Sequence, residues 1–262
     1  MLGIPHGLNR KEQAPMPIFK FLATLTAALL LALAASAQAL ASEMMDQAAV
    51  LYSQRAEAGK AQQAADVYGK VLQGDPKNEE AAWRRSQALY WAGTHAPEKE
   101  QVGILEKAVE AAKQAVAINP QSLPGHYWLG VCYGVYGKAK GIMKSLALVD
   151  PIKEEMAFVT KAKPGYEEGG AYRVLGRLYF KLPGLAGGSN SKAVENLKKS
   201  VELGPQRWIN HLYLAEVYLA TDKKAEAQAL LKQIIAGPAQ TGLEPEYADW
   251  KAEAEKMLKQ AD

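Results

Sequence analysis

The sequence of 262 residues contains only one cysteine, Cys132. An intramolecular disulfide is therefore excluded, and a metal site built from cysteines has no support. Histidine is scarce as well, because only His6, His95, His126 and His211 occur, and their spacing does not match that of metal ligands. We therefore expect neither a metal nor a cofactor.

Neither sign of charge predominates in the sequence, which has 31 basic and 28 acidic residues. Residues 1–41 hold three of these basic residues and one of the acidic ones, so the remainder carries a net charge of +1. This balance gives no electrostatic reason to expect binding to nucleic acid or to an anionic membrane. Alanine is abundant and runs of β-branched residues are scarce, so the composition favours helices.

Charged residues are absent from residues 21–41, which are mostly alanine and leucine and follow Lys20. The run ends in two Ala-x-Ala sequences, which place cleavage after Ala39 or Ala41. A basic start, an apolar middle and an end of this kind predict a secretory signal peptide over residues 1–41.

The apolar run is also about long enough to span a bilayer, so an uncleaved membrane anchor is the alternative. Its alanine-rich end favours cleavage, and a start at Met16 gives a more compact signal of the same kind. No cysteine lies near the cleavage positions, which excludes a lipid-anchored lipoprotein. We therefore expect residues 42–262 to form a periplasmic or secreted domain that contacts the membrane only through the signal sequence.

The stretch from residue 169 to residue 205 carries the clearest structural signal. Tyr172, Leu175, Gly176 and Tyr179 have the spacing aromatic-x-x-Leu-Gly-x-x-Tyr. The residues that follow at the spacing of a second helix are Ala193, Leu197, Ser200 and Pro205. This order is that of one two-helix tetratricopeptide unit. One unit cannot bury its apolar face alone, so neighbouring units are expected.

Further helix pairs with the same pattern occur on both sides of this stretch. The prolines that close the five units are Pro76, Pro120, Pro164, Pro205 and Pro238, with successive gaps of 44, 44, 41 and 33 residues. The last gap is close to the basic repeat length of about 34 residues, and the others exceed it by loop-sized insertions. A final amphipathic helix over residues 244–260 is expected to cap the array with its charged side toward solvent.

Three connections within the pairs carry specific predictions. Residues 94–103 are expected to be a loop between the two helices of the second pair. In the third pair the first helix is expected to continue to Leu148, with Asp150 as the N-cap of the second helix. In the fourth pair a glycine-rich loop is expected to end at Ser189 or Asn190, which caps the next helix.

With these five pairs, most of residues 45–241 resembles bacterial tetratricopeptide repeat (TPR) proteins. The resemblance implies an all-α, right-handed α-solenoid of about five TPR-like helical hairpins plus a C-terminal capping helix. A narrower resemblance rests on residues 171–177 and 182–193, which contain a Leu-Gly-Arg helix, a glycine-containing insertion and a Lys-Ala helix start. In these features the chain is similar to the T component of tripartite ATP-independent periplasmic (TRAP) transporters and to the regulator of microtubule dynamics family.

Five residues on the first helices of the pairs are candidates for binding a partner. Arg173 and Arg177 are four residues apart, so they share one helix face, and neither is at a packing position of the motif. Arg84 and Tyr127 occupy the place of Arg173 in the second and third pairs, and Glu216 occupies that of Arg177 in the fifth. Two guanidinium groups there can clamp a carboxylate or a peptide C-terminus. The alternative is a solvated helix face with local ion pairs.

No acid–base pair, nucleophile motif or metal cluster is recognisable, so we do not expect an enzyme. His126 and His211 fall at the aromatic motif position and Cys132 within a packed helix, so packing roles are expected for all three. The sequence predicts instead a periplasmic scaffold that binds a protein or peptide segment in the concave groove of the solenoid. The alternative is a protein like the T component of TRAP transporters, which handles a small organic or lipidic ligand.

Overall fold

Helices form most of the part of the chain that this computed structural model describes, which is residue 36 and residues 38–261. Residues 38–53 are helical. The helices after them are α2 (Lys60–Gly74), α3 (Glu79–Thr94), α4 (Glu98–Ile118), α5 (Leu123–Lys140), α6 (Ile142–Ala147), α7 (Val149–Ala162), α8 (Gly170–Lys181), α9 (Asn190–Leu203), α10 (Trp208–Leu219), α11 (Lys224–Ala236) and α12 (Glu244–Ala261). Apart from its last few residues, the signal peptide expected over residues 1–41 lies outside the described residues. None of the described helices is long and apolar enough to cross a membrane.

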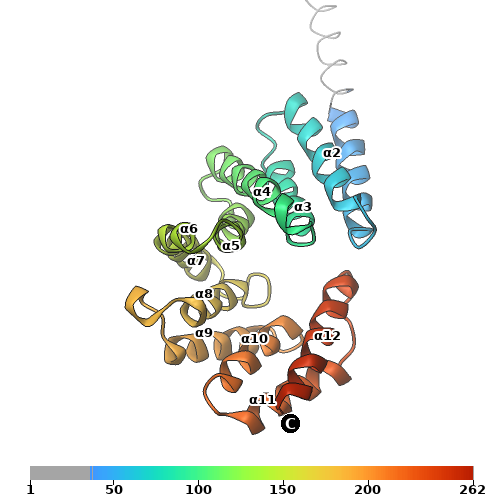
Figure 1. Cartoon of the computed structure of the whole chain (residues 1–262). Coiled ribbons are helices and arrows are strands. Elements are labelled where there is room, and N and C mark those ends of the chain that lie inside the picture. Colours follow the sequence, from blue (N-terminus) through green and yellow to red (C-terminus); the bar gives the residue numbers. More distant parts are fainter. Residues whose placement is uncertain (1–35, 37, 262) are drawn as a thin grey trace, which may run out of the picture. The chain divides into compact units, whose positions relative to one another are not determined.

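Residues 44–262 form one compact unit built from consecutive helical hairpins. Hairpin 1 is the first helix with α2, hairpin 2 is α3 with α4, hairpin 3 is α5 with α7, hairpin 4 is α8 with α9, and hairpin 5 is α10 with α11. Each hairpin packs mainly against the hairpins next to it in sequence, and α12 packs on α10 and α11 (Figure 1). The expected all-α solenoid of TPR-like hairpins is therefore confirmed.

Two clusters of buried apolar side chains meet at α8. The first cluster fills hairpins 1 to 3, and the second fills the space between α9, α10, α11 and α12. On α8, Leu175 packs against the first cluster and Tyr179 against the second. A Cβ atom at Gly176 would lie 2.5 Å from Leu197 Cγ, so α9 can approach this closely only because the motif has glycine there.

The predictions for two of the three connections are wrong. Residues 98–103 belong to α4 and not to a loop, because Pro97 at the N-cap and Glu98 in the first turn favour a helix start. The helix α5 ends at Gly141, whose φ of 106° suits glycine, and the short α6 then folds back on α5. Leu148 and not Asp150 precedes α7. In the fourth pair, Ser189 caps α9 as expected, since its Oγ accepts from the Lys192 amide.

The first and last parts of the array contact each other through a buried arginine. Arg55, in the turn after the first helix, donates from Nε to Glu246 of α12 at 2.8 Å and from Nη2 to the Gly242 carbonyl at 2.6 Å. His95 after α3 also lies 3.3 Å from Asp249 of α12. The start of α12 therefore faces hairpins 1 and 2, and Glu246 departs from the expected solvent-facing charged side because its side chain is only 18% exposed. We call the Arg55–Glu246 pair the closing contact.

Candidate functional site

Arg173 of α8 links the first helices of three successive hairpins. Its guanidinium donates to Tyr127 Oη on α5 at 2.7 Å and to Asn210 Oδ1 on α10 at 2.8 Å. Burial acts to lower the pKa of Arg173, but the neighbouring Tyr127 and Glu167 keep that pKa above its ordinary value. Asn210 is fully buried and its amide donates to three backbone carbonyls. The position of the Arg173 side chain is therefore fixed by groups of the chain itself.

A second cluster lies one turn further along the same helices. Arg177 of α8 and Lys181 both pair with Glu216 of α10, and the Arg177 guanidinium lies 4.3 Å from the centre of the Tyr213 ring. Burial acts to raise the pKa of Glu216, yet hydrogen bonds from Lys181 and the charge of Arg177 hold it below its ordinary value. The carboxylate of Glu216 is therefore ionised at neutral pH and is held by two cations.

The structure thus brings four of the five predicted residues together, as the pairs Tyr127–Arg173 and Arg177–Glu216. Arg84 makes different contacts, because it donates to Glu80 at 2.7 Å and lies over the Trp83 ring at 4.5 Å. These ion pairs between neighbouring helices also agree with the alternative, a solvated helix face with local ion pairs. Whether these residues bind a partner stays a prediction.

Three tyrosines near these clusters have phenol groups that make no hydrogen bond within the described residues: Tyr90, Tyr166 and Tyr213. Burial raises the pKa of Tyr90 well above its ordinary value, and the nearby Tyr213, Tyr127 and Arg173 also act on it. The first helices of hairpins 2 to 5 contact one another in order, α3 with α5, α5 with α8 and α8 with α10. The first helices of hairpins 2 to 5 consequently line one inner face.

The repeat pattern does not distinguish Tyr90 or Tyr213 as a site residue. Tyr90 occupies the tyrosine position of the repeat motif, where the pattern indicates packing between helices. Tyr213 stands two residues after the aromatic position, where hairpin 3 has Trp128, and no motif position falls there.

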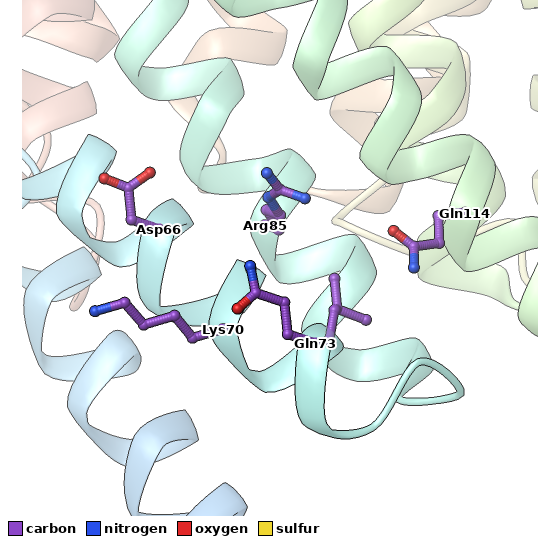
Figure 2. A pocket seen from close by; sticks show the side chains of 7 residues that line it. Asp66, Lys70, Gln73, Arg85 and Gln114 are labelled. Atoms are coloured by element: carbon purple, nitrogen blue, oxygen red, sulfur yellow. The ribbon is translucent and has the colours of Figure 1, made fainter.

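A separate pocket of about 410 Å³ lies between α2, α3 and α4. Figure 2 shows the side chains that line it, among them Asp66, Lys70, Gln73, Arg85 and Gln114. Within the described residues, Arg85 Nε is buried and has no hydrogen-bond partner. The pocket is of ligand size but contains none of the residues predicted as a site.

The residues expected to have packing roles are in packed surroundings. His126 stacks on Phe158 with ring centres 3.8 Å apart, and His211 is buried beside Trp208. Cys132 is fully buried, which raises the pKa of its thiol to about 12. In residues 38–261, no group of three or more His, Cys, Asp or Glu side chains is placed to hold a metal ion.

Comparison with known proteins places this geometry among TPR folds. The family model described as regulator of microtubule dynamics protein 1-3 matches residues 44–187 and 182–262. TTC0263, a thermophilic TPR protein in Thermus thermophilus, is 20% identical with a TM-score of 0.61, and the match covers 82% of this chain and 99% of that chain. PilW, a type IV pilus biogenesis factor, is 20% identical with a TM-score of 0.54, over 84% of this chain and 93% of that chain. No curated protein sequence matches.

Proposed function

Since the chain belongs to the regulator of microtubule dynamics protein 1-3 family and folds as a TPR solenoid, we propose that it is a non-enzymatic scaffold that binds a protein or peptide segment. The segment binds in the concave groove formed by the first helices of the hairpins. The observation that carries the proposal is the bonding of Arg173 to Tyr127 and to Asn210, which joins the first helices of three hairpins into one inner face.

The fixed charges prepare the groove for binding. Tyr127, Arg173, Arg177 and Glu216 are already held by one another or by Asn210, so little side-chain entropy is lost when a partner arrives. The phenol groups of Tyr90 and Tyr213 can then donate to carbonyls of an extended segment, and their rings supply contact area. Arg84 contributes a further cation beyond these clusters, for a carboxylate of the bound segment.

The proposal includes a location outside the cytoplasm. It is supported by the charge-free run of residues 21–41 and its Ala-x-Ala ends, with cleavage after Ala39 or Ala41. In that setting the scaffold acts on partners in the periplasm or in the medium.

One observation favours the alternative, a T-component-like protein that handles a small organic or lipidic ligand. The closing contact joins hairpin 1 to α12, which restricts access to the inner face. A restricted interior suits an enclosed small ligand better than an open groove does. The experiment below is chosen to separate the two functions.

The test places a photo-crosslinking phenylalanine analogue, p-benzoylphenylalanine, at position 90 or 213 in cells that express the chain. Both positions are aromatic, so the replacement is mild, and the matched control carries the same group at Lys232, which is exposed on α11. We expect the same protein to be captured from positions 90 and 213 but not from position 232.

Two results would decide against a protein-binding groove. Capture with equal yield from position 232 would mean that the inner face has no special role. Capture of a small organic or lipidic molecule alone, identified by mass spectrometry, would support the alternative. Adding Arg177→Gln to the chain labelled at position 90 should reduce the yield of the captured protein, because it releases Glu216 and the Tyr213 ring.

A further inference from the structure

Two turns between the helices of hairpins 3 and 4 expose large apolar side chains to solvent. Ile142 and Met143 at the start of α6 are 62% and 78% exposed, and Leu185 in the turn before α9 is fully exposed. Only two other large apolar residues of the described chain are comparably open, and both lie on the first helix. Exposed apolar groups on a projecting turn are commonly contact points for another surface.

The two turns lie on the same edge of the solenoid. Arg173 bonds to Tyr127 on α5 and to Asn210 on α10, and each of these residues is in the first part of its helix. Further along, Arg177 of α8 pairs with Glu216 of α10, so successive first helices run in the same direction. The C-terminal ends of α5, α8 and α10 and the turns that follow therefore share one edge. In Figure 1, α6 and the turn between α8 and α9 accordingly lie on the same side.

This edge is basic, although the net charge of the domain is close to zero. No acidic residue occurs in residues 111–149 or in residues 169–194. Four lysines at the end of α5, on α6 and at the start of α9 form no ion pair within the described residues: Lys138, Lys140, Lys144 and Lys192. Acidic residues bound the region at Glu98, the first residue of α4, and at Asp222 in the turn of hairpin 5. Asp150 in the first turn of α7 pairs with Lys153 of the same helix. We name these four lysines, with Ile142, Met143 and Leu185, the basic edge.

We propose that the basic edge docks on an anionic lipid surface, with Ile142, Met143 and Leu185 inserted among the headgroups. Lysine is depleted in protein–protein interfaces, whereas at a membrane its long stem lies along the apolar region and its ammonium group reaches the phosphates. Three protruding apolar side chains surrounded by lysines match the composition of such interfacial segments. The inference does not rest on the proposed groove, which lies on the first helices.

The test uses residues 44–262, which contain both apolar clusters and should fold alone. Binding is measured by co-sedimentation with vesicles of phosphatidylcholine alone or mixed with phosphatidylglycerol. Each lysine near an anionic surface raises partitioning about fivefold, so changing the four lysines of the basic edge to glutamine should weaken binding by at least about tenfold. A control with the same net charge changes four exposed lysines away from this edge: Lys77, Lys161, Lys163 and Lys232.

We expect the control to lose less than about twofold, and binding to fall as salt is raised, because surface charges are screened beyond about 8 Å at physiological ionic strength. Ile142→Ser with Met143→Ser and Leu185→Ser should also weaken binding while circular dichroism stays unchanged, since all three are exposed. Equal losses from the basic edge and the control would overturn the proposal, as would no binding to the mixed vesicles.

A second measurement distinguishes a lipid surface from an acidic protein. Cys132 is fully buried, so a dye that senses polarity can be attached at Met143→Cys alone, with Lys163→Cys as the matched control. We expect a blue shift of the dye at position 143 with phosphatidylglycerol vesicles and none at position 163. Binding to soluble polyglutamate with no blue shift on vesicles would assign the basic edge to an acidic protein and overturn the lipid proposal.

Discussion

Breaking the closing contact should loosen the two ends of the array and leave its middle folded. The side chains of Arg55 and Glu246 are only 4% and 18% exposed, so the pair is largely shielded from water. The guanidinium of Arg55 also lies 5.0 Å from the centre of the Tyr52 ring and 5.2 Å from that of Trp91. Because each hairpin otherwise contacts mainly its neighbours, the loss should remain local.

The expected magnitude follows from what each substitution removes. Taking one partner from a buried ion pair costs about 3–5 kcal/mol, because the other charge is left without compensation. Glu246→Gln keeps one oxygen acceptor and leaves the bond from Arg55 to the Gly242 carbonyl, so we expect about 2–3 kcal/mol. Arg55→Met loses these bonds and both ring contacts, so about 3–5 kcal/mol is expected. The double-mutant coupling energy should be about 2 kcal/mol.

Urea denaturation followed by circular dichroism measures these energies, and hydrogen exchange locates them. Exchange should accelerate in residues 44–74 and in α12 but not in α8. The matched control is the pair Lys256–Glu253 on α12, whose side chains are 63% and 48% exposed. Its coupling energy should stay below about 0.5 kcal/mol. A coupling energy below about 0.5 kcal/mol for Arg55 and Glu246 would show that the closing contact does not stabilise the fold. Faster exchange spread evenly over all hairpins would show that its effect is not local.

Three further predictions concern the packed interior. Gly176→Ala should destabilise the fold by about 1–3 kcal/mol, because the added Cβ collides with Leu197. Gly134→Ala should stabilise the fold by about 0.5–1 kcal/mol, because a Cβ there meets nothing within 4 Å. Equal urea midpoints for the two variants would contradict this. Cys132, whose pKa burial raises to about 12, should not react with a maleimide at pH 8 until urea unfolds the chain, and native labelling would show an open core. Burial lowers the pKa of His211 in the folded chain, so the unfolded chain binds this proton at a higher pH. The free energy of unfolding should therefore fall as the pH drops below about 6.5. The total loss is about 1.4 kcal/mol for each unit by which folding lowers the pKa. His211→Phe should remove this part of the pH dependence, and an unchanged slope between pH 7 and pH 5 would contradict it.

The repeat pattern could be predicted from the sequence because packing within a hairpin fixes its period. Gly176 must be small where α9 crosses α8, and Leu197 must fill the space beside it, so both recur at set distances. The end of α5 could not be predicted in this way. No proline stops the helix after Gly137, and α6 folds back only because Ser145 can approach that glycine, where a Cβ would lie 3.1 Å from the Ser145 Cα.

The candidate site was predicted in part for a related reason. Spacing alone placed Arg173 and Arg177 on one helix face, and the structure agrees. Their partners Tyr127, Asn210 and Glu216 lie in other hairpins, so no local pattern pairs them. The distribution of charge could not be predicted from the sequence either. The net charge of residues 42–262 is +1, and the lysines lie together on one edge only because the first helices run in the same direction.

The closing contact also bears on how such a chain can change in evolution. A solenoid ordinarily gains or loses whole units, since each one contacts only its neighbours. Here one hairpin more or fewer would move α12 away from Arg55, and a shielded charge would lose its counter-charge. The contact therefore fixes the number of hairpins between the first turn and α12. Variation in length is confined to the turns, such as residues 182–189, where added residues leave the count of units unchanged.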